Sequence, residues 1–248
     1  MKEIIAFGAG YDVSDGIKVF VKSAKKHCDK LTVITLNVKD ELIFFLQNED
    51  VNVVRGSDLS EKYKVSQSIS PYTLKTIFFY LYTKHVTKSD QVYLCDFTDI
   101  FIQRSPFELI KTDKVYVTSE NYPIVKCDTN TTWINICYNS DIYNLLKDKE
   151  ILNGGNILGI RESCVDLLHE MTLDTADVMS RIGNYTNIDQ AILNKVVYFD
   201  KFRYNILRNK EIINLAYSST MTDFSKTYVI HQYDVNKQLE ALLYGKYK

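Results

Sequence analysis

The stretch Val92-Tyr93-Leu94-Cys95-Asp96-Phe97-Thr98-Asp99-Ile100-Phe101 indicates both a fold class and a place for chemistry. Its apolar beginning is typical of a buried strand, and two carboxylates follow directly. Side chains at positions i and i+3 of a straight strand point to opposite faces, so Asp96 and Asp99 converge only if the chain turns at the strand end. Ligands of parallel sheets bind at that end. The stretch therefore predicts a parallel sheet with an acidic site at its carboxyl edge.

Short apolar runs and stretches of helical periodicity alternate on both sides of this segment. The predicted strands are residues 4–7, 31–36, 51–54, 92–95, 114–118, 156–160, 212–217 and 228–230. The predicted helices begin at Ser14 or Asp15 and at Ser70-Pro71, and cover 39–47, 142–146, 163–171, 188–197 and 236–244. This order predicts an α/β fold, with one domain over residues 1–248 and a mixed, mostly parallel sheet flanked by helices.

The composition is that of an ordinary globular protein. Of the 248 residues, 46% are hydrophobic and 25% charged, with only 9 Gly and 3 Pro, which excludes collagen-like and low-complexity classes. The 30 basic and 31 acidic residues give a formal net charge of -1. Such a chain has no global attraction for nucleic acid or an anionic membrane, so local groups must hold any polyanionic ligand.

Cysteine spacing and hydropathy indicate a compartment. The five cysteines are an odd number, widely spaced and without a Cys-x-x-Cys pair, which argues against a disulfide framework and a thiolate zinc site. The amino terminus has no signal-peptide pattern, and no apolar run approaches the ~20 residues of a membrane helix. We therefore expect a cytoplasmic protein without a membrane span, and the oligomeric state stays open.

The acidic pair Asp96 and Asp99 is the strongest candidate site. Two converging carboxylates in a nearly neutral protein need a cation between them, and oxygen ligands favour Mg²⁺ or Mn²⁺. Such an ion can bridge to a diphosphate. The alternative is structural: Asp96 caps a turn and Asp99 is solvated.

Glycines after the first predicted strand form a second candidate site. The sequence Gly8-Ala9-Gly10 lacks the third glycine of a dinucleotide-binding G-x-G-x-x-G motif, because Val13 stands in its place. This departure argues against a Rossmann-type dehydrogenase or methyltransferase. The turn either allows backbone to approach a ligand or is simply tight.

Three further segments carry polar or flexible residues next to predicted elements. His231 ends a short apolar strand and is either a core histidine or a nitrogen ligand for a metal. Gly154-Gly155 permits close approach of a ligand or marks a bulge. Asn187 is a good helix cap, so Asp189 after it either offsets the helix dipole or reaches toward ligand hydroxyls.

The order of these segments resembles that of nucleotide-sugar glycosyltransferases with the A-type fold. Residues 96–107, Asp-Phe-Thr-Asp-Ile-Phe-Ile-Gln-Arg-Ser-Pro-Phe, are similar to the family's D-x-x-D-h-h-h-Q-x-x-P-F segment, where h is apolar. Further similar segments are the helix at 71–81, the Asn-Gly-Gly turn at 153–159, the Asp-Gln helix at 187–194 and the His-Gln-Tyr-Asp segment at 229–234.

The resemblance implies a metal-dependent transferase. Asp99 would be the direct ligand of Mn²⁺ or Mg²⁺, and His231 would be a further ligand. Asp96 would bind the ion, its water shell or the ribose. The family usually has D-x-D where this chain has D-x-x-D, so which carboxylate binds the metal directly stays open.

The resemblance also assigns the donor and the acceptor. Residues 1–110 would bind a nucleotide-diphosphate sugar, with a UDP-sugar as first choice, and residues 111–248 would bind the sugar and a glycan or protein-linked sugar acceptor. The base and ribose would lie on Phe7, Gly8, Ala9 and Gly10, the diphosphate near Lys75, and the sugar and acceptor on Gly154 and Gly155. Asp189 or Gln190 would be catalytic. The alternative function is a non-catalytic nucleotide- or carbohydrate-binding module on the same fold.

Overall fold

A seven-stranded sheet forms the centre of the computed structural model, which describes residues 1–247 except 67, 184–187, 200–202, 209 and 218–222. Its strand order is β3-β2-β1-β4-β7-β6-β8. The bounds are β1 (Lys2–Ala9), β2 (Lys30–Leu36), β3 (Asn52–Arg55), β4 (Gln91–Cys95), β6 (Val115–Pro123), β7 (Glu150–Ile160) and β8 (Tyr204–Leu207). Among these strands only β7 is antiparallel to both neighbours. The predicted α/β fold with a mostly parallel sheet is confirmed.

A second, smaller sheet combines one strand that follows β4 with two strands from residues 212–231. Its strands are β5 (Ile100–Ile102), β9 (Ile212–Asn214) and β10 (Val229–His231), in the order β5-β10-β9. The helices are α1 (Asp15–Ala24), α2 (Asp40–Asn48), α3 (Gly56–Tyr63), α4 (Pro71–His85), α5 (Asp128–Cys137), α6 (Ser140–Leu146), α7 (Arg161–Ile182), α8 (Asp189–Phe199) and α9 (Lys237–Tyr247).

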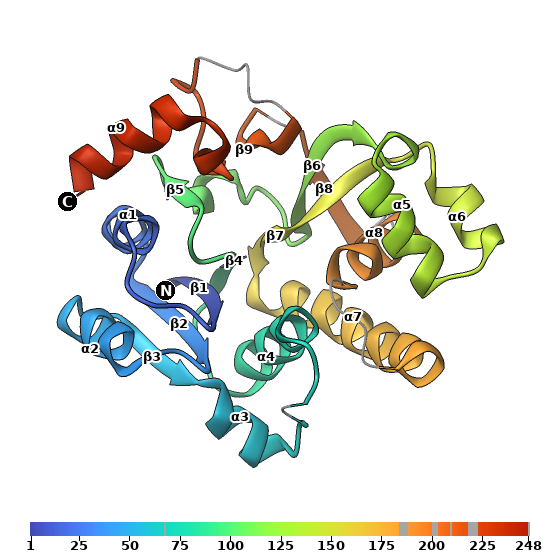
Figure 1. The fold of residues 1–248 in the computed structure, drawn as a ribbon, viewed down its shortest axis with the longest axis horizontal. Helices are drawn as coiled ribbons and strands as arrows, with labels where there is room; N and C mark the ends of the chain where they lie inside the picture. Colours follow the sequence, from blue (N-terminus) through green and yellow to red (C-terminus); the bar gives the residue numbers. More distant parts are fainter. Residues whose placement is uncertain (67, 184–187, 200–202, 209, 218–222, 248) are drawn as a thin grey trace.

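Hydrophobic residues cover both faces of the large sheet. In β1, Ile5 and Phe7 join the cluster under α4 and α7, while Ile4 and Ala6 join the cluster under α1. Both faces of a parallel strand are buried in this way when helices lie on each side. Figure 1 shows α4 and α7 on one side of the sheet and α1 with the small sheet and α9 on the other.

Local sequence explains where several elements begin. The Ser14 side chain accepts a hydrogen bond from the Ile17 amide at 3.3 Å and caps α1, as predicted. Proline stands at the start of α4, where its missing N–H costs nothing. The predicted strand at residues 212–217 is shorter in the structure, because residues 215–217 form a 3₁₀ turn.

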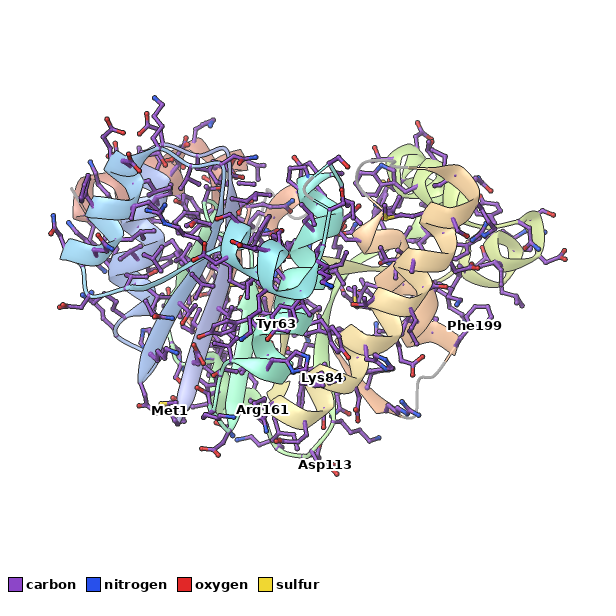
Figure 2. The ribbon with its side chains drawn as sticks, turned by 90° about the horizontal axis from the view of Figure 1, so that it is seen from below. Met1, Tyr63, Lys84, Asp113, Arg161 and Phe199 are labelled. Carbon is purple, nitrogen blue, oxygen red and sulfur yellow. The ribbon has the colours of Figure 1, made fainter. Side chains whose placement is uncertain are left out.

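The strands of the large sheet have their ends at two opposite edges of the sheet, and different residues lie at each. Met1, Asp113 and Arg161 lie along one edge in Figure 2, next to the start of β1, the start of β6 and the end of the reversed strand β7. The carboxyl ends of β1 and β4 therefore lie at the opposite edge.

No helix in the described part of the chain is both long and apolar enough to cross a membrane. All five cysteines are free thiols, and all but Cys28 are buried.

Candidate functional site

A cavity of about 480 Å³ lies at the carboxyl edge of the large sheet. Its walls come from segments far apart in the chain: the turn after β1, the first turn of α4, the turn after β4, the middle of β7, the start of α8 and the end of β10. Crevices outside the carboxyl ends of parallel strands are the usual ligand sites of such sheets. Residues 96–99, which follow the predicted strand at 92–95, line this cavity.

Three of the predicted residues meet inside the cavity. The Nε2 atom of His231 lies 3.4 Å from an oxygen of Asp96 and 3.5 Å from an oxygen of Asp99. One ligand atom from each residue lies within 4.8 Å of the other two. The two acids converge because the chain turns between β4 and β5, and His231 reaches them because β10 pairs with β5, His231 opposite Ile100. The predicted convergence is therefore present.

Buried hydrogen bonds set the orientation of the histidine ring. Its Nδ1 lies 2.8 Å from Oδ1 of Asn214 and 3.0 Å from the amide nitrogen of Asn156. Its Nε2 has no hydrogen-bond partner among the described residues, although the side chain is only 2% exposed. When Nδ1 carries the proton and donates it to Asn214, the Nε2 lone pair faces both carboxylates, as a metal ligand requires.

The charges of the site explain its titration. Burial lowers the pKa of His231, but the Asp99 and Asp96 carboxylates outweigh it and raise the pKa to about 10. Burial raises the pKa of Asp96, but Lys75 and His231 reverse this and hold the pKa well below its usual range. Both acids therefore favour positive charge at Nε2, which a proton or a cation can supply.

Gly155 fits between two members of this group. A Cβ atom at this position would lie 2.2 Å from Oδ2 of Asp96 and 2.8 Å from Cε1 of His231. Its carbonyl accepts the Asp96 amide at 3.3 Å. A glycine is thus required for the acid and the imidazole to approach each other. Two carboxylates and one imidazole form a donor set that can hold a divalent cation, and a nitrogen ligand suits Mn²⁺ better than Mg²⁺.

Lys75 joins the metal-ligand group to α8. Its ammonium lies 3.1 Å from Asp96 and 2.9 Å from Asp189, and its side chain is 10% exposed. Burial lowers the pKa of Lys75, but the Asp189 and Asp96 carboxylates outweigh it, so the pKa lies above its usual range. The lysine lines the cavity, as predicted for a diphosphate contact, but two carboxylates already bind it. Its structural role is to connect the ends of β4 and α8.

Only part of the predicted glycine turn faces the cavity. Phe7 and Ala9 line it, whereas Gly8 and Gly10 do not. Gly8 packs against the Phe97 ring, where a Cβ atom would lie 2.6 Å from a ring carbon. Gly10 has a φ of +70° and no neighbour within 4 Å of a Cβ. A tight turn therefore accounts for Gly10, and packing accounts for Gly8.

The segment around Gly154 is a bulge of β7. Val117 pairs with Ile157 but Thr118 pairs with Asn153, so residues 154–156 are extra on the β7 side. The Gly154 amide donates to Oε1 of Gln190 at 3.1 Å. The bulge interpretation of the paired glycines is therefore confirmed, and the bulge carries both glycines into the cavity lining. Close approach of a ligand to them stays a prediction.

The start of α8 brings the predicted catalytic residues to the same cavity. Asp189 and Gln190 both line it. The Gln190 amide nitrogen donates to Oδ1 of Asn130 at 2.9 Å, so both ends of this side chain hold protein groups. The predicted cap Asn187 lies outside the described residues.

Sequence reasoning missed several residues of the site. Three are aromatic residues that line the cavity, namely Tyr11, Tyr72 and Trp133. Tyr11 follows the glycine turn and Tyr72 follows Pro71. The sequence could have indicated these two residues through their position next to predicted site residues. Asn214 and Glu120 gave none, because long-range packing alone brings them beneath the site.

No protein-family model matches the chain, and no curated protein matches it in sequence. The case for an activity rests on the geometry of this cavity.

Proposed function

We propose that this chain is a metal-dependent glycosyltransferase. It would move a sugar from a nucleotide-diphosphate sugar, a UDP-sugar first, to a hydroxyl of a glycan or other acceptor. The observation that carries the proposal is that Asp96, Asp99 and His231 meet in one cavity. Gly155 leaves room for Asp96 and His231, which a larger residue would not.

Charge in the cavity supports a requirement for a divalent cation. Its charged lining comprises three carboxylates and one ammonium, a formal charge of -2 when His231 is neutral. A diphosphate would be repelled by such a lining, and a divalent cation between the carboxylates removes the repulsion. Metal binding would therefore precede or accompany nucleotide binding.

The two ends of the cavity suit different parts of a nucleotide sugar. Tyr11 and Phe97 line the end next to β1, and flat aromatic rings are good partners for a base. Trp133 and Asp189 line the end formed by α5 and α8, which combines an aromatic ring with a polar acceptor for hydroxyls. Strand order places the acids of β4 between these ends. We therefore assign the base to the β1 end and the transferred sugar to the α8 end.

Roles in the reaction follow from this placement. When bound, the metal supplies Lewis-acid stabilisation of the charge that develops on the departing diphosphate. Asp96, Asp99 and His231 hold it, and Asp189 is our choice of base for an acceptor hydroxyl if the reaction inverts the sugar. Gln190 is the weaker choice, because Gly154 and Asn130 already bind both ends of its amide. In a retaining reaction Gln190 or backbone would instead stabilise the sugar.

The test is a panel of nucleotide sugars incubated with the protein and Mn²⁺, with released nucleotide as the readout. We expect slow hydrolysis of at least one donor, and thermal stabilisation by its nucleoside diphosphate only when metal is present. Asp99→Asn should abolish both effects. Asp148→Asn, which changes an exposed acid between α6 and β7, is the matched control and should keep them.

The outcomes separate the candidate functions. Metal-dependent binding without turnover of any donor would indicate the non-catalytic module. Failure of every nucleotide to bind with either ion would refute the proposal, and binding of a nicotinamide dinucleotide or S-adenosylmethionine without metal would replace it.

A further inference from the structure

Glu120 is a buried carboxyl group that the proposed reaction does not use. It lies in β6, is 3% exposed, and forms no ion pair among the residues that the structure describes. Burial raises its pKa, and a hydrogen bond from Asn153 acts in the opposite direction. Burying a carboxyl group without a cation beside it costs free energy, so the contacts of Glu120 need an explanation.

A continuous chain of hydrogen bonds runs from Glu120 to the candidate metal ligands. Oε1 of Glu120 accepts the Asn153 amide nitrogen at 2.8 Å. Oδ1 of Asn153 then accepts the Gly155 amide at 2.8 Å and the Asn156 amide nitrogen at 3.2 Å. The Gly155 carbonyl in turn accepts the Asp96 amide at 3.3 Å, which completes the chain to a candidate ligand. The Asn156 side chain also packs against His231, with its amide nitrogen 3.0 Å from Nδ1. Every member of this chain before Asp96 is buried.

The chemistry of the carboxyl group fixes the direction of the chain. An ionised Glu120 can only accept, and its Oε1 does accept from Asn153, so the amide of Asn153 turns its NH₂ toward β6 and its oxygen toward the bulge. That oxygen is what holds the Gly155 amide. A flipped Asn153 would place a donor against the Gly155 N–H and release the bulge.

We infer that Glu120 is a positioning residue for the metal site, acting through Asn153 on the bulge that carries Gly155. The position of the bulge is narrowly restricted, because Gly155 lies against both Asp96 and His231 and its carbonyl accepts the Asp96 amide. Loss of the Glu120 contact would let the bulge move and spread the ligands. This inference rests on the metal site of the proposed function.

The test is Mn²⁺ affinity without any nucleotide, measured by electron paramagnetic resonance of free Mn²⁺, together with the thermal midpoint of the metal-free protein. Glu120→Met removes the acceptor, and we expect Mn²⁺ affinity to fall by about 10- to 100-fold, as for other residues that support metal ligands. Glu120→Gln keeps an acceptor oxygen and should stay within about threefold of wild type. Asn153→Ala breaks the next link and should resemble Glu120→Met, and the double variant should lose no more than either alone.

Glu3→Gln is the matched control, because Glu3 is another fully buried carboxylate, at the opposite edge of the sheet. It should lower the thermal midpoint and leave Mn²⁺ affinity unchanged. Wild-type affinity in Glu120→Met would overturn the inference alone, and so would equal losses in Glu120→Gln and Glu120→Met. If Glu120→Met does not fold, Asn153→Ala decides by the same criteria. A wild-type protein that binds no Mn²⁺ would overturn the metal site and this inference together.

Discussion

The neighbouring glycines of β7 stand in very different surroundings. A Cβ on Gly155 would overlap Asp96 and His231, whereas a Cβ on Gly154 would lie 3.5 Å or more from its nearest neighbours, Asp189 and Gln190. We expect Gly155→Ala to lose stabilisation by Mn²⁺ and to unfold more easily by about 1–3 kcal/mol, the usual cost of overpacking. Gly154→Ala should keep both properties. Thermal unfolding with and without Mn²⁺ checks the pair, and equal behaviour of the two variants would contradict the site geometry.

Among the residues that the structure describes, Lys75 is the one cation in the charged lining of the cavity besides His231. Replacing it by methionine leaves Asp96 and Asp189 without their partner, and breaking a buried pair typically costs 3–5 kcal/mol. Because Asp96 is partly exposed, we expect a loss of about 3 kcal/mol in the free energy of unfolding, measured in urea.

Two further variants make this prediction specific. Lys18→Met breaks an exposed ion pair with Asp15 and should cost less than about 1 kcal/mol. Adding Asp189→Asn to Lys75→Met should recover part of the loss, because it removes one stranded charge. A double variant less stable than Lys75→Met would show that the lysine acts through packing instead of charge.

At the scale of elements, β1 carries a buried carboxylate at the edge away from the cavity. Glu3 accepts hydrogen bonds from Thr32 at 2.6 Å, Tyr82 at 2.8 Å and Ser89 at 2.7 Å, and also from Thr87. Burial raises the pKa of Glu3, but these bonds outweigh it, so the pKa lies below the usual value for a glutamate. The ionised form is therefore the one that the fold stabilises.

The sign of the pH dependence follows from this lowered pKa. The stabilisation by Glu3 is fully present above the pKa of the unfolded chain and is lost as the pH falls through the lower pKa of the folded chain. Glu3→Gln should cost about 2 kcal/mol at pH 7, the range for hydrogen bonds to charged groups. The gap between variant and wild type should close as the pH drops below about 4.5. Urea unfolding across this range checks it, and a gap that widens in acid would contradict the assignment.

Elements with strong local patterns could be predicted from the sequence, and elements defined by distant partners could not. Three core strands, β1, β2 and β4, begin and end within about two residues of their predicted ranges. The capped helix α1 begins where it was predicted. The short strands β5 and β8 were missed, because three or four residues carry little periodicity. The paired glycines indicated the bulge of β7 as one alternative, but the reversal of β7 depends on pairing with β4 and β6, which no local pattern reveals.

The same division holds for the site as a whole. The three candidate ligands were predicted individually, because an acidic pair after a strand and a histidine at a strand end are local features. The supporting groups Asn214, Glu120 and Trp133 were not, since only the folded chain brings them to β4. The contacts of Lys75 with two carboxylates were not predicted, because they depend on charge balance in the folded cavity, and its contact with a diphosphate stays a prediction.

The charge of the whole molecule leads to a prediction about salt. With a net charge of -1 the chain exerts little long-range attraction on a nucleotide, so the proposed recognition would depend on the ion that we propose. Close, partly buried contacts are screened much less than exposed ones. The dissociation constant of the proposed nucleoside diphosphate with saturating Mn²⁺ should change less than about threefold between about 50 and about 200 mM salt. Calorimetric titration would measure this, and a steep decline would point to surface charge as the main attraction.

His231 lies in β10, almost at the end of the chain, whereas its two acidic neighbours follow β4. During synthesis on the ribosome the acids therefore emerge long before the imidazole, and the pocket between them stays incomplete until β10 leaves the exit tunnel. Every shortened product of interrupted translation that ends before β10 would lack the third ligand. If the proposed metal site exists, the position of one histidine makes metal binding depend on a chain that extends through β10.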